Sequence, residues 1–355
     1  MSPIGKRTIP FIAILLLIVA CTTASPTTIP TEQILVPPIE PTLEQTTAIT
    51  LPTQEPTKPS TEVPIPTETL MPSATPLPLG GSSTIVFGSN RDGDFTNIYL
   101  LNTSDGSVTR LTTGGSNTFP GSFSPNGTQL LFTGFGLTNS FVGLMNADGT
   151  DPVDLSGRQS VDEGFPTWSP DGQQIAFTSR MDGNKEIYIM NTDGTNIKRI
   201  TYDPSDDFAP AWSPDGTQIA FVSDRDNPTG VNNLYLMNVD GSGMVRLTNG
   251  NEIDYGPAWS PDGRQIAFRA DIDGNGDIFA INVDGSGRVN LTNNPESDWA
   301  PAWSPDGKLI AFQTNRDGNW EIYVMNSDGS NPINLTHNPA DDQMPYWKPA
   351  ATSTN

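Results

Sequence analysis

The sequence PTWSPDG at residues 166–172 decides the fold of this chain, because it recurs at a nearly constant interval. Its other copies are GSFSPNG at 121–127, PAWSPDG at 210–216, 257–263 and 301–307, and a shortened PYWKP at 345–349. The aromatic residues of successive copies lie 44 to 47 residues apart. A repeat of this length is typical of proteins built from stacked or radially arranged structural units.

Each repeat contains four short segments that favour β-strands. The PTWSPDG copy is the first, and it is followed by IAF at 175–177, IYIMN at 187–191 and a segment that ends in Leu-Thr or its equivalent. These segments are rich in β-branched and aromatic residues, and turn sequences such as Ser-Pro-Asp-Gly or Asp-Gly separate them. The pattern predicts a four-stranded antiparallel meander in every repeat.

The middle strands are apolar on both faces, which predicts how the meanders pack. Within 186–191, Ile187 and Ile189 point to one face. Tyr188 and Met190 point to the other. A sheet that is buried on both faces must lie between two neighbours, so we predict an all-β, six-bladed β-propeller. The first repeat lacks its first strand and the last copy lacks the strands after it, so pairing these fragments would close the ring; an open β-solenoid would leave them unpaired.

The N-terminal residues resemble the signal of a bacterial lipoprotein. Lys6 and Arg7 precede an apolar run that ends in IVAC at 18–21. This run is too short to span a bilayer as a permanent helix. The resemblance implies cleavage before Cys21 and lipidation of that residue, whereas the alternative is an ordinary secretory signal with an incidental cysteine.

The composition divides the chain into four parts. We predict a lipoprotein signal peptide at 1–20, then the lipidated Cys21 at the start of a disordered Pro/Thr-rich tether at 21–82, a propeller at 83–349 and a disordered tail at 350–355. The tether has too little apolar surface to form a core of its own.

The charge and the residue usage exclude several classes of function. The chain has 40 acidic and 18 basic residues and a formal net charge of −22, which argues against electrostatic binding of nucleic acid. Its single cysteine excludes an internal disulfide and a cysteine cluster for zinc. The only histidine, His337, follows a Leu-Thr segment in a predicted connecting loop, so we expect no histidine-based catalysis.

The order of motifs within each repeat resembles that of TolB-type, WD-like propellers. The motifs are WSPDG, IAF, a loop of the S-x-R-D-G kind, IY-x-MN, a DG turn and LT, and the resemblance covers residues 83 to about 349. It implies a six-bladed propeller on the extracytoplasmic side that binds other proteins and performs no chemistry. The family's namesake carries an α/β domain where this chain has its Pro/Thr-rich segment, which puts participation in a Tol-Pal type machine in doubt.

Strand parity predicts that the connections between blades share one face with the loops between second and third strands. Five residues before the repeated aromatic, this face carries an acidic residue in five blades: Glu163, Asp207, Asp254, Asp298 and Asp342. One position later, four blades carry an aromatic residue: Phe119, Phe208, Tyr255 and Trp299. Trp320 is expected on the same face. We interpret these residues as an acidic, aromatic-lined channel mouth that binds an envelope protein or a basic peptide segment.

Two alternatives to this interpretation remain open. In the first, the carboxylates cap their own loops or pair with loop arginines, and the aromatic residues pack between blades. The arginines concerned are Arg91, Arg180, Arg225 and Arg316. In the second, the chain is a carbohydrate-binding or carboxylate-based glycan-processing propeller.

The segment from 271 to 277 fits the first positions of a calcium-binding loop. Its candidate ligands are Asp271, Asp273, Asn275 and Asp277. The twelfth position is Asn282 rather than the usual bidentate glutamate, so a plain hairpin is the alternative.

Together these features predict a non-enzymatic, monomeric lipoprotein on the extracytoplasmic face of a bacterial membrane, in the periplasm or at the cell surface. We expect it to contact the membrane only through its lipid. We expect it to need no cofactor, unless the segment 271–277 binds calcium.

Overall fold

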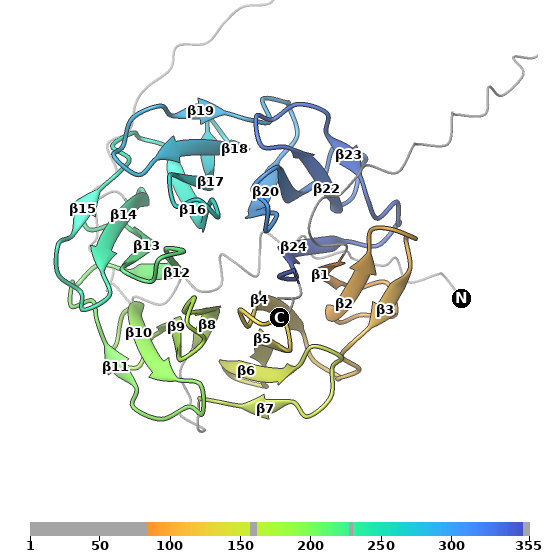
Figure 1. Ribbon diagram of the computed structural model, residues 1–355, viewed down its shortest axis with the longest axis horizontal. Coiled ribbons are helices and arrows are strands. Elements are labelled where there is room, and N and C mark those ends of the chain that lie inside the picture. Colours follow the sequence, from red (N-terminus) through yellow and green to blue (C-terminus); the bar gives the residue numbers. More distant parts are fainter. Residues whose placement is uncertain (1–83, 157–161, 227–229, 351–355) are drawn as a thin grey trace, which may run out of the picture. The chain divides into compact units, whose positions relative to one another are not determined.

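The computed structural model describes residues 84–156, 162–226 and 230–350 of the protein, and this part of the chain consists of strands, turns and loops. Figure 1 shows six four-stranded antiparallel sheets arranged radially about one axis. No helix among the described residues is long and apolar enough to cross a membrane. The predicted signal peptide, Cys21 and the predicted tether lie outside the described residues.

The blades are numbered here in chain order, starting from the one that contains β1. Blade 1 consists of β24 (Asp342–Trp347), β1 (Thr84–Ser89), β2 (Asn97–Asn102) and β3 (Val108–Arg110). Blade 2 consists of β4 (Thr118–Phe123), β5 (Gln129–Phe135), β6 (Ser140–Asn146) and β7 (Val153–Asp154). Blade 3 consists of β8 (Glu163–Trp168), β9 (Gln174–Ser179), β10 (Glu186–Asn191) and β11 (Lys198–Arg199).

The remaining three blades repeat this order. Blade 4 consists of β12 (Asp207–Trp212), β13 (Gln218–Ser223), β14 (Asn233–Asn238) and β15 (Val245–Arg246). Blade 5 consists of β16 (Ile253–Trp259), β17 (Gln265–Ile272), β18 (Asn275–Asn282) and β19 (Val289–Asn290). Blade 6 consists of β20 (Asp298–Trp303), β21 (Leu309–Thr314), β22 (Glu321–Asn326) and β23 (Ile333–Asn334). The first strand named in each blade lies nearest the axis (Figure 1).

Blade 1 joins the two ends of the described chain. Its inner strand β24 pairs antiparallel with β1, with Trp347 opposite Ile85 and Asp342 opposite Ser89. The indole Nε1 of Trp347 also donates a hydrogen bond to the carbonyl oxygen of Ala302 in blade 6, at 3.1 Å. The C-terminal strand therefore completes one blade and contacts the next.

The core lies between the blades, as the apolar pattern of the middle strands predicts. Ile187 and Ile189 of β10 pack in one cluster with Phe221 of blade 4. Tyr188, on the opposite face of the same strand, packs in another cluster with Leu131 of blade 2. Each fully buried side chain of this size stabilises the fold by about 1.5–3 kcal/mol, so a blade depends on both of its neighbours.

The inner strands share a β-bulge, at which two residues lie opposite one residue of the second strand. In five blades the first bulged residue has φ between 51° and 56°: Phe165, Ala209, Gly256, Ala300 and Met344. A left-handed backbone costs about 1–2 kcal/mol for residues other than glycine. In blade 2 the corresponding residue is Pro120, whose ring requires a negative φ. The bulge of blade 2 accordingly lies one residue later, at Gly121 and Ser122.

The Ser-Pro-Asp-Gly turns are held by their own side chains. In blade 3, the hydroxyl of Ser169 donates to Asp171 Oδ1 at 2.6 Å and accepts from the backbone N–H of Gln174 at 2.9 Å. The Ser169 hydroxyl is the main reason that the pKa of Asp171 is lowered. Blades 4, 5 and 6 repeat the Ser-to-Asp bond at 2.6–2.7 Å, so these aspartates have a structural role.

The glycine of the turn between third and fourth strands allows a close contact between blades. Gly194 has φ +81°, and a Cβ at this position would lie 2.6 Å from the carbonyl oxygen of Leu155 in the preceding blade. Gly274 has a similar φ of +88°, but a Cβ there would meet no atom within 4 Å. The two positions therefore separate the effect of φ from that of the contact.

We expect Gly194→Ala to lower the Tm by about 4 °C or more relative to Gly274→Ala, since both variants carry the same backbone strain and only the first pushes two blades apart. Thermal unfolding followed by circular dichroism measures the difference. Equal Tm values for the two variants would contradict the close contact.

Candidate functional site

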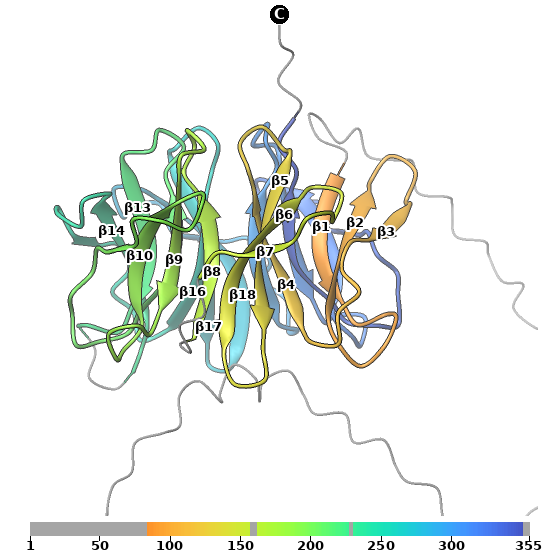
Figure 2. The same cartoon turned by 90° about the horizontal axis from the view of Figure 1, so that it is seen from below.

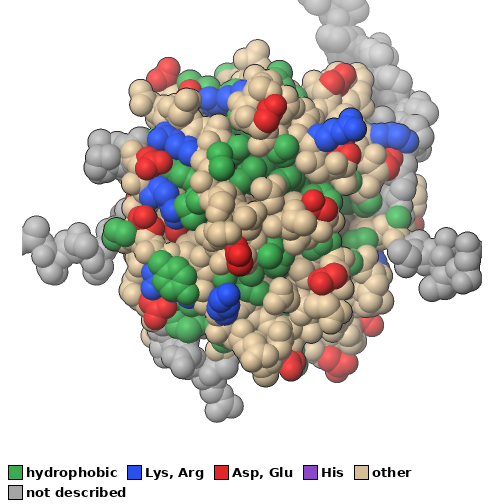
Figure 3. All heavy atoms as spheres, turned by 60° about the vertical axis from the view of Figure 1, so that its left-hand side comes forward, with side chains coloured by type: hydrophobic (Ala, Val, Ile, Leu, Met, Phe, Trp, Pro, Cys, Tyr) green, Lys and Arg blue, Asp and Glu red, His purple; other side chains and the backbone are tan. Residues whose placement is uncertain are grey.

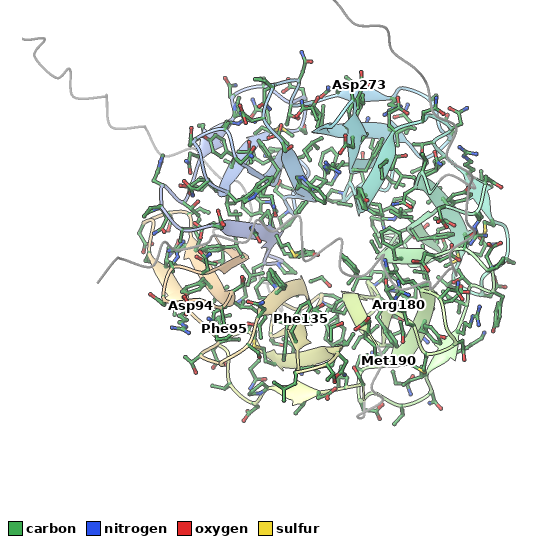
Figure 4. The ribbon with its side chains drawn as sticks, turned by 180° about the vertical axis from the view of Figure 1, so that it is seen from behind. Asp94, Phe95, Phe135, Arg180, Met190 and Asp273 are labelled. Carbon is green, nitrogen blue, oxygen red and sulfur yellow. The ribbon has the colours of Figure 1, made fainter. Side chains whose placement is uncertain are left out.

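The two faces of the propeller differ in how uniform their loops are. Because the strands of each blade alternate in direction, the Ser-Pro-Asp-Gly and Asp-Gly turns share one face, here called the uniform face (Figure 2). The loops between second and third strands share the opposite face with the connections between blades. We call this the variable face, and Figure 4 views the molecule from this side, with Phe95, Phe135, Arg180 and Asp273 labelled.

The five acidic residues predicted on the variable face begin the inner strands, but their side chains are buried. Their exposed fractions do not exceed 3%: Glu163, Asp207, Asp254, Asp298 and Asp342. The expectation that these carboxylates line an open acidic mouth is therefore corrected, because none of them is available at the surface of the folded chain.

In three blades a loop arginine pairs with the buried carboxylate. This pairing is one of the alternatives that the sequence left open. Arg91 donates two hydrogen bonds to Asp342, at 2.9 and 2.8 Å. The corresponding pairs are Arg225 with Asp207 at 2.6 Å and Arg316 with Asp298 at 3.0 Å. We call these three pairs the arginine clips. Each joins the start of an inner strand to the loop between second and third strands of its own blade, and breaking such a pair leaves an uncompensated buried charge.

Blades 3 and 5 keep the buried carboxylate but lack the clip. In clipped blades the arginine lies two residues after the residue of the second strand that is opposite the buried carboxylate, as Arg225 does after Ser223, the partner of Asp207. Blade 3 has Met181 at this position and blade 5 has Ile272. Arg180, one residue earlier, pairs with Asp206 at 3.4 Å instead.

Burial raises the pKa of both unclipped carboxylates. Burial raises the pKa of Glu163 to about 7, and neither of its oxygens has a hydrogen-bond partner at normal distance, although the hydroxyls of Ser156 and Ser179 lie close enough to offset part of the effect. Burial also raises the pKa of Asp254 to about 7, against a hydrogen bond from Thr248. Asp207 keeps its arginine, and its pKa rises only to about 6.

A second set of buried carboxylates was not identified from the sequence. Glu186 and Glu321 begin the third strands of blades 3 and 6, Asp277 lies two residues into the third strand of blade 5, and all three are at most 7% exposed. In these three blades the threonine of the Leu-Thr or Ile-Thr segment donates to the carboxylate, for example Thr201 to Glu186 at 2.6 Å. The same threonine hydroxyl accepts the N–H of Ile187 at 2.9 Å. Two sequence features could have identified this set. In these three blades an acidic residue directly precedes the Ile-Tyr or Ile-Phe pair, and it lies at a fixed distance before the threonine of the following segment.

The predicted aromatic residues of blades 4, 5 and 6 form part of a continuous row near the axis. The row also includes Phe165, and neighbouring ring centroids lie 5.5–6.4 Å apart in the order Phe165, Phe208, Tyr255 and Trp299. We call it the aromatic arc. It joins the inner strands of four consecutive blades.

Cations of this chain already stack on the aromatic arc. The Nζ atom of Lys185 lies 4.7 Å from the ring centroid of Phe208, and the guanidinium carbon of Arg269 lies 3.7 Å from that of Trp299. Arg269 is 4% exposed and pairs with Asp271 at 2.8 Å. The arc therefore presents ring edges and partly covered ring faces rather than an empty aromatic cage.

The other two predicted aromatic residues lie apart from the arc. Phe119 of β4 is 6% exposed and meets Phe135 edge-on, with ring centroids 5.7 Å apart. Trp320 is half-buried in the blade 6 loop, where its backbone N–H donates to Asp341 Oδ1 and its carbonyl oxygen accepts from the N–H of Asp342.

The predicted calcium loop is a hairpin whose side chains have separate partners. Asp273 and Gly274 form a tight turn with positive φ between β17 and β18. Asp271 pairs with Arg269, Asn275 donates to the carbonyl oxygen of Asn294, and Asp277 accepts hydrogen bonds from Asn290 and Thr292. Among the residues described by the structure, no three His, Cys, Asp or Glu side chains gather as a metal site requires. The geometry favours the hairpin reading over calcium.

The unclipped Glu163 generates a prediction about pH. Its folded-state pKa of about 7 lies above the ordinary value of 4.5, so its contribution to stability is complete below pH 4.5 and is lost as the pH rises through 7. Glutamine resembles the protonated form, so we expect Glu163→Gln to raise the Tm at pH 8 and to change it little at pH 4.

The clipped Asp298 serves as the control for this measurement. Asp298→Asn removes the ion pair and leaves Arg316 without its carboxylate, so it should lower the Tm at pH 8. Thermal melts of both variants at the two pH values test the distinction, which fails if the two substitutions shift the Tm at pH 8 in the same direction.

Comparison with known proteins agrees with this architecture. Residues 123–231 match a family model described as the TolB beta propeller domain. No curated protein matches the chain. Among solved structures, TolB from Acinetobacter baumannii is similar at 23% identity, over 76% of this chain and 67% of that one, with a TM-score of 0.65.

Two further structures extend the comparison. A putative TolB from Agrobacterium tumefaciens is 26% identical over 72% of this chain and 88% of that one, with a TM-score of 0.58. The Kuenenia stuttgartiensis hydrazine synthase shares the fold at 17% identity over 77% of this chain and 47% of its own length, with a TM-score of 0.61. The described part of the chain is thus a six-bladed β-propeller, and residues 123–231 within it match the TolB beta propeller domain.

Proposed function

We propose that this protein is a non-enzymatic, lipid-anchored scaffold on the extracytoplasmic side of a bacterial membrane, and that its propeller binds other proteins through the variable face. The observation that carries this proposal is the difference between the two faces. The uniform face consists of self-bonded turns that repeat from blade to blade, whereas the variable face departs from symmetry in loop sequence, in clipping and in aromatic content. Binding residues are commonly found on variable loops held by a rigid scaffold.

The arrangement of carboxylates favours binding over catalysis. Acid–base hydrolysis of a glycan needs two carboxyl groups that face one substrate. The acidic residues near the start of the inner strands are instead buried, and three of them are ion-paired within the protein. They support the loops that surround them.

Charge favours a basic partner. The chain carries a net charge of −22, and many of its arginines are already neutralised, for example Arg199 by Asp182 at 3.4 Å and Arg246 by Asp226 at 3.8 Å. Figure 3 shows basic and acidic side chains side by side on the outer surface. An acidic field steers basic proteins or peptide segments toward the propeller and repels acidic ones.

A glycan ligand is the second candidate, and the aromatic arc is the observation that favours it. Aromatic rings in a row offer apolar surfaces with polar groups nearby, as carbohydrate sites do. An oligogalacturonate lyase shares the propeller fold at 19% identity, with a TM-score of 0.51, which supports the architecture alone.

If the variable face binds partners, the full chain carrying Trp299→Ala should capture envelope proteins about tenfold more weakly than the wild type. A loss of this size is typical of a central aromatic residue of an interface. Ile197→Ala is the control, because Ile197 is a 39% exposed apolar residue in the turn between β10 and β11, on the uniform face. Quantitative affinity capture from envelope extract measures the effect, and a thermal melt checks that both variants remain folded. Equal capture by Trp299→Ala and the wild type would contradict the proposal, and competition by free oligosaccharides would favour the glycan candidate.

The proposed anchor is tested separately. We expect wild-type protein to partition into membranes and Cys21→Ser to be released as soluble protein or left unprocessed, since two acyl chains on one cysteine give stable attachment at about 0.8 kcal/mol per buried CH₂. Fractionation followed by immunoblotting measures this, and membrane partitioning of the Ser variant equal to that of the wild type would contradict lipidation at this residue.

A further inference from the structure

Blade 2 departs from the other five blades in its charge. Residues 111–147 contain no Asp, Glu, Lys, Arg or His, although the chain as a whole is strongly acidic. This stretch supplies both variable-face segments of blade 2, namely the connection that precedes β4 and the loop between β5 and β6. In every other blade both corresponding segments contain a carboxylate. Blade 2 is therefore an uncharged sector of an acidic face.

The variable-face loop of blade 2 has apolar side chains, whereas the corresponding loops of the other blades have charged ones. Leu137, in the blade 2 loop, is fully exposed, and Phe135 at the start of that loop is half-buried. Phe95, in the neighbouring loop of blade 1, is 44% exposed. We call Phe95, Phe135 and Leu137 the uncharged patch.

Hydrogen bonds show that the members of the patch are neighbours. The side-chain oxygen of Asn117 accepts the N–H of Thr96 at 2.8 Å, and the carbonyl oxygen of the same residue accepts the N–H of Phe135 at 3.0 Å. Asn117 thus holds the Phe95 loop beside Phe135. The Leu137 loop is closed by a bond from Gly136 N–H to the carbonyl oxygen of Asn139, at 2.7 Å. Figure 4 shows Phe95 and Phe135 on adjacent blades.

We propose that the uncharged patch is the docking site for an apolar segment of a partner protein, with a basic residue beside its apolar side chain. This inference rests on the proposed protein-binding function and assigns it a position and a chemistry. The apolar side chain would cover Leu137 and Phe135 with little desolvation of charge, because neither the connection before β4 nor the loop between β5 and β6 contains an ionic group. The basic residue would face Asp94, which is exposed next to Phe95, whereas Asp92 in the same loop already pairs with Arg110 at 3.4 Å.

Charge and size argue against a second copy of this chain or a lipid membrane as the occupant of the uncharged patch. A second copy of this chain would bring an equally acidic surface against Asp92 and Asp94, and three side chains fall well short of the roughly 800 Å² per partner that a stable dimer buries. Anionic lipid headgroups would be repelled by the same carboxylates. A short segment of a neutral or basic protein meets neither obstacle.

The test uses the full chain and a displayed library of random short peptides. We expect the selected peptides to share a Trp, Phe or Leu next to Lys or Arg, and to bind Leu137→Asp at least about tenfold more weakly than the wild type. Leu137→Met should retain binding. Ile272→Asp is the matched control, because Ile272 is a 38% exposed aliphatic residue at the end of β17, directly before the corresponding loop of blade 5, and this variant should bind as the wild type does.

Several results would overturn the inference. Selected peptides that bind Leu137→Asp as tightly as the wild type, or that lose as much affinity with Ile272→Asp, would place the site elsewhere. A dimer in sedimentation velocity that Leu137→Asp dissociates would assign the patch to a second copy, and flotation with phosphatidylcholine or phosphatidylglycerol vesicles that Leu137→Asp abolishes would assign it to a membrane.

The outcomes also separate this inference from the proposed function. If Trp299→Ala weakens protein capture while Leu137→Asp has no effect, the inference fails and the scaffold function stands. If neither substitution affects capture and no peptide is enriched, both fail.

Discussion

Every blade of this protein is apolar on both faces, and the rest of the structure depends on that constraint. A strand such as β10 sends Ile187 and Ile189 toward one neighbouring blade and Tyr188 toward the other, so a blade without two neighbours would expose its core. Radial packing provides two neighbours for every blade only if the ring closes. The pairing of β24 with β1 and the hydrogen bond from Trp347 to Ala302 provide this closure from the two ends of the described chain.

Close packing between blades leaves polar groups at the strand ends with no access to water, and the protein satisfies them in a repeated way. Leu-Thr hydroxyls bond the carboxylates that begin some of the third strands, and arginine clips neutralise three of the carboxylates that begin the inner strands. Where Met181 or Ile272 replaces the arginine, the carboxylate stays buried and its pKa rises to about 7. The blades are alike in shape, but they differ in how well their buried charges are compensated.

These differences make the ring asymmetric on one face only. The turns of the uniform face bond to themselves, and glycines such as Gly194 fit against the next blade, so substitutions there act on stability. On the variable face, the two loop segments of blade 2 contain no charged residue. Its bulge is also shifted, because Pro120 replaces a left-handed residue. Four other inner strands carry the aromatic arc. A propeller with such an asymmetric face can distinguish partners by the direction from which they bind.

The sequence by itself determined the number of blades, their strands, the closure and the two faces, because turn chemistry and the alternation of apolar residues act over a few residues and repeat in register. It also located the carboxylates and the arginines, but it left open whether they meet. Only the tertiary structure decided that Asp207, Asp298 and Asp342 are buried against their arginines, that Asp271 and Asp277 point to separate partners, and that Asn117 joins Phe95 to Phe135. These outcomes depend on side-chain direction and solvent access between segments as far as 251 residues apart, which no local pattern encodes.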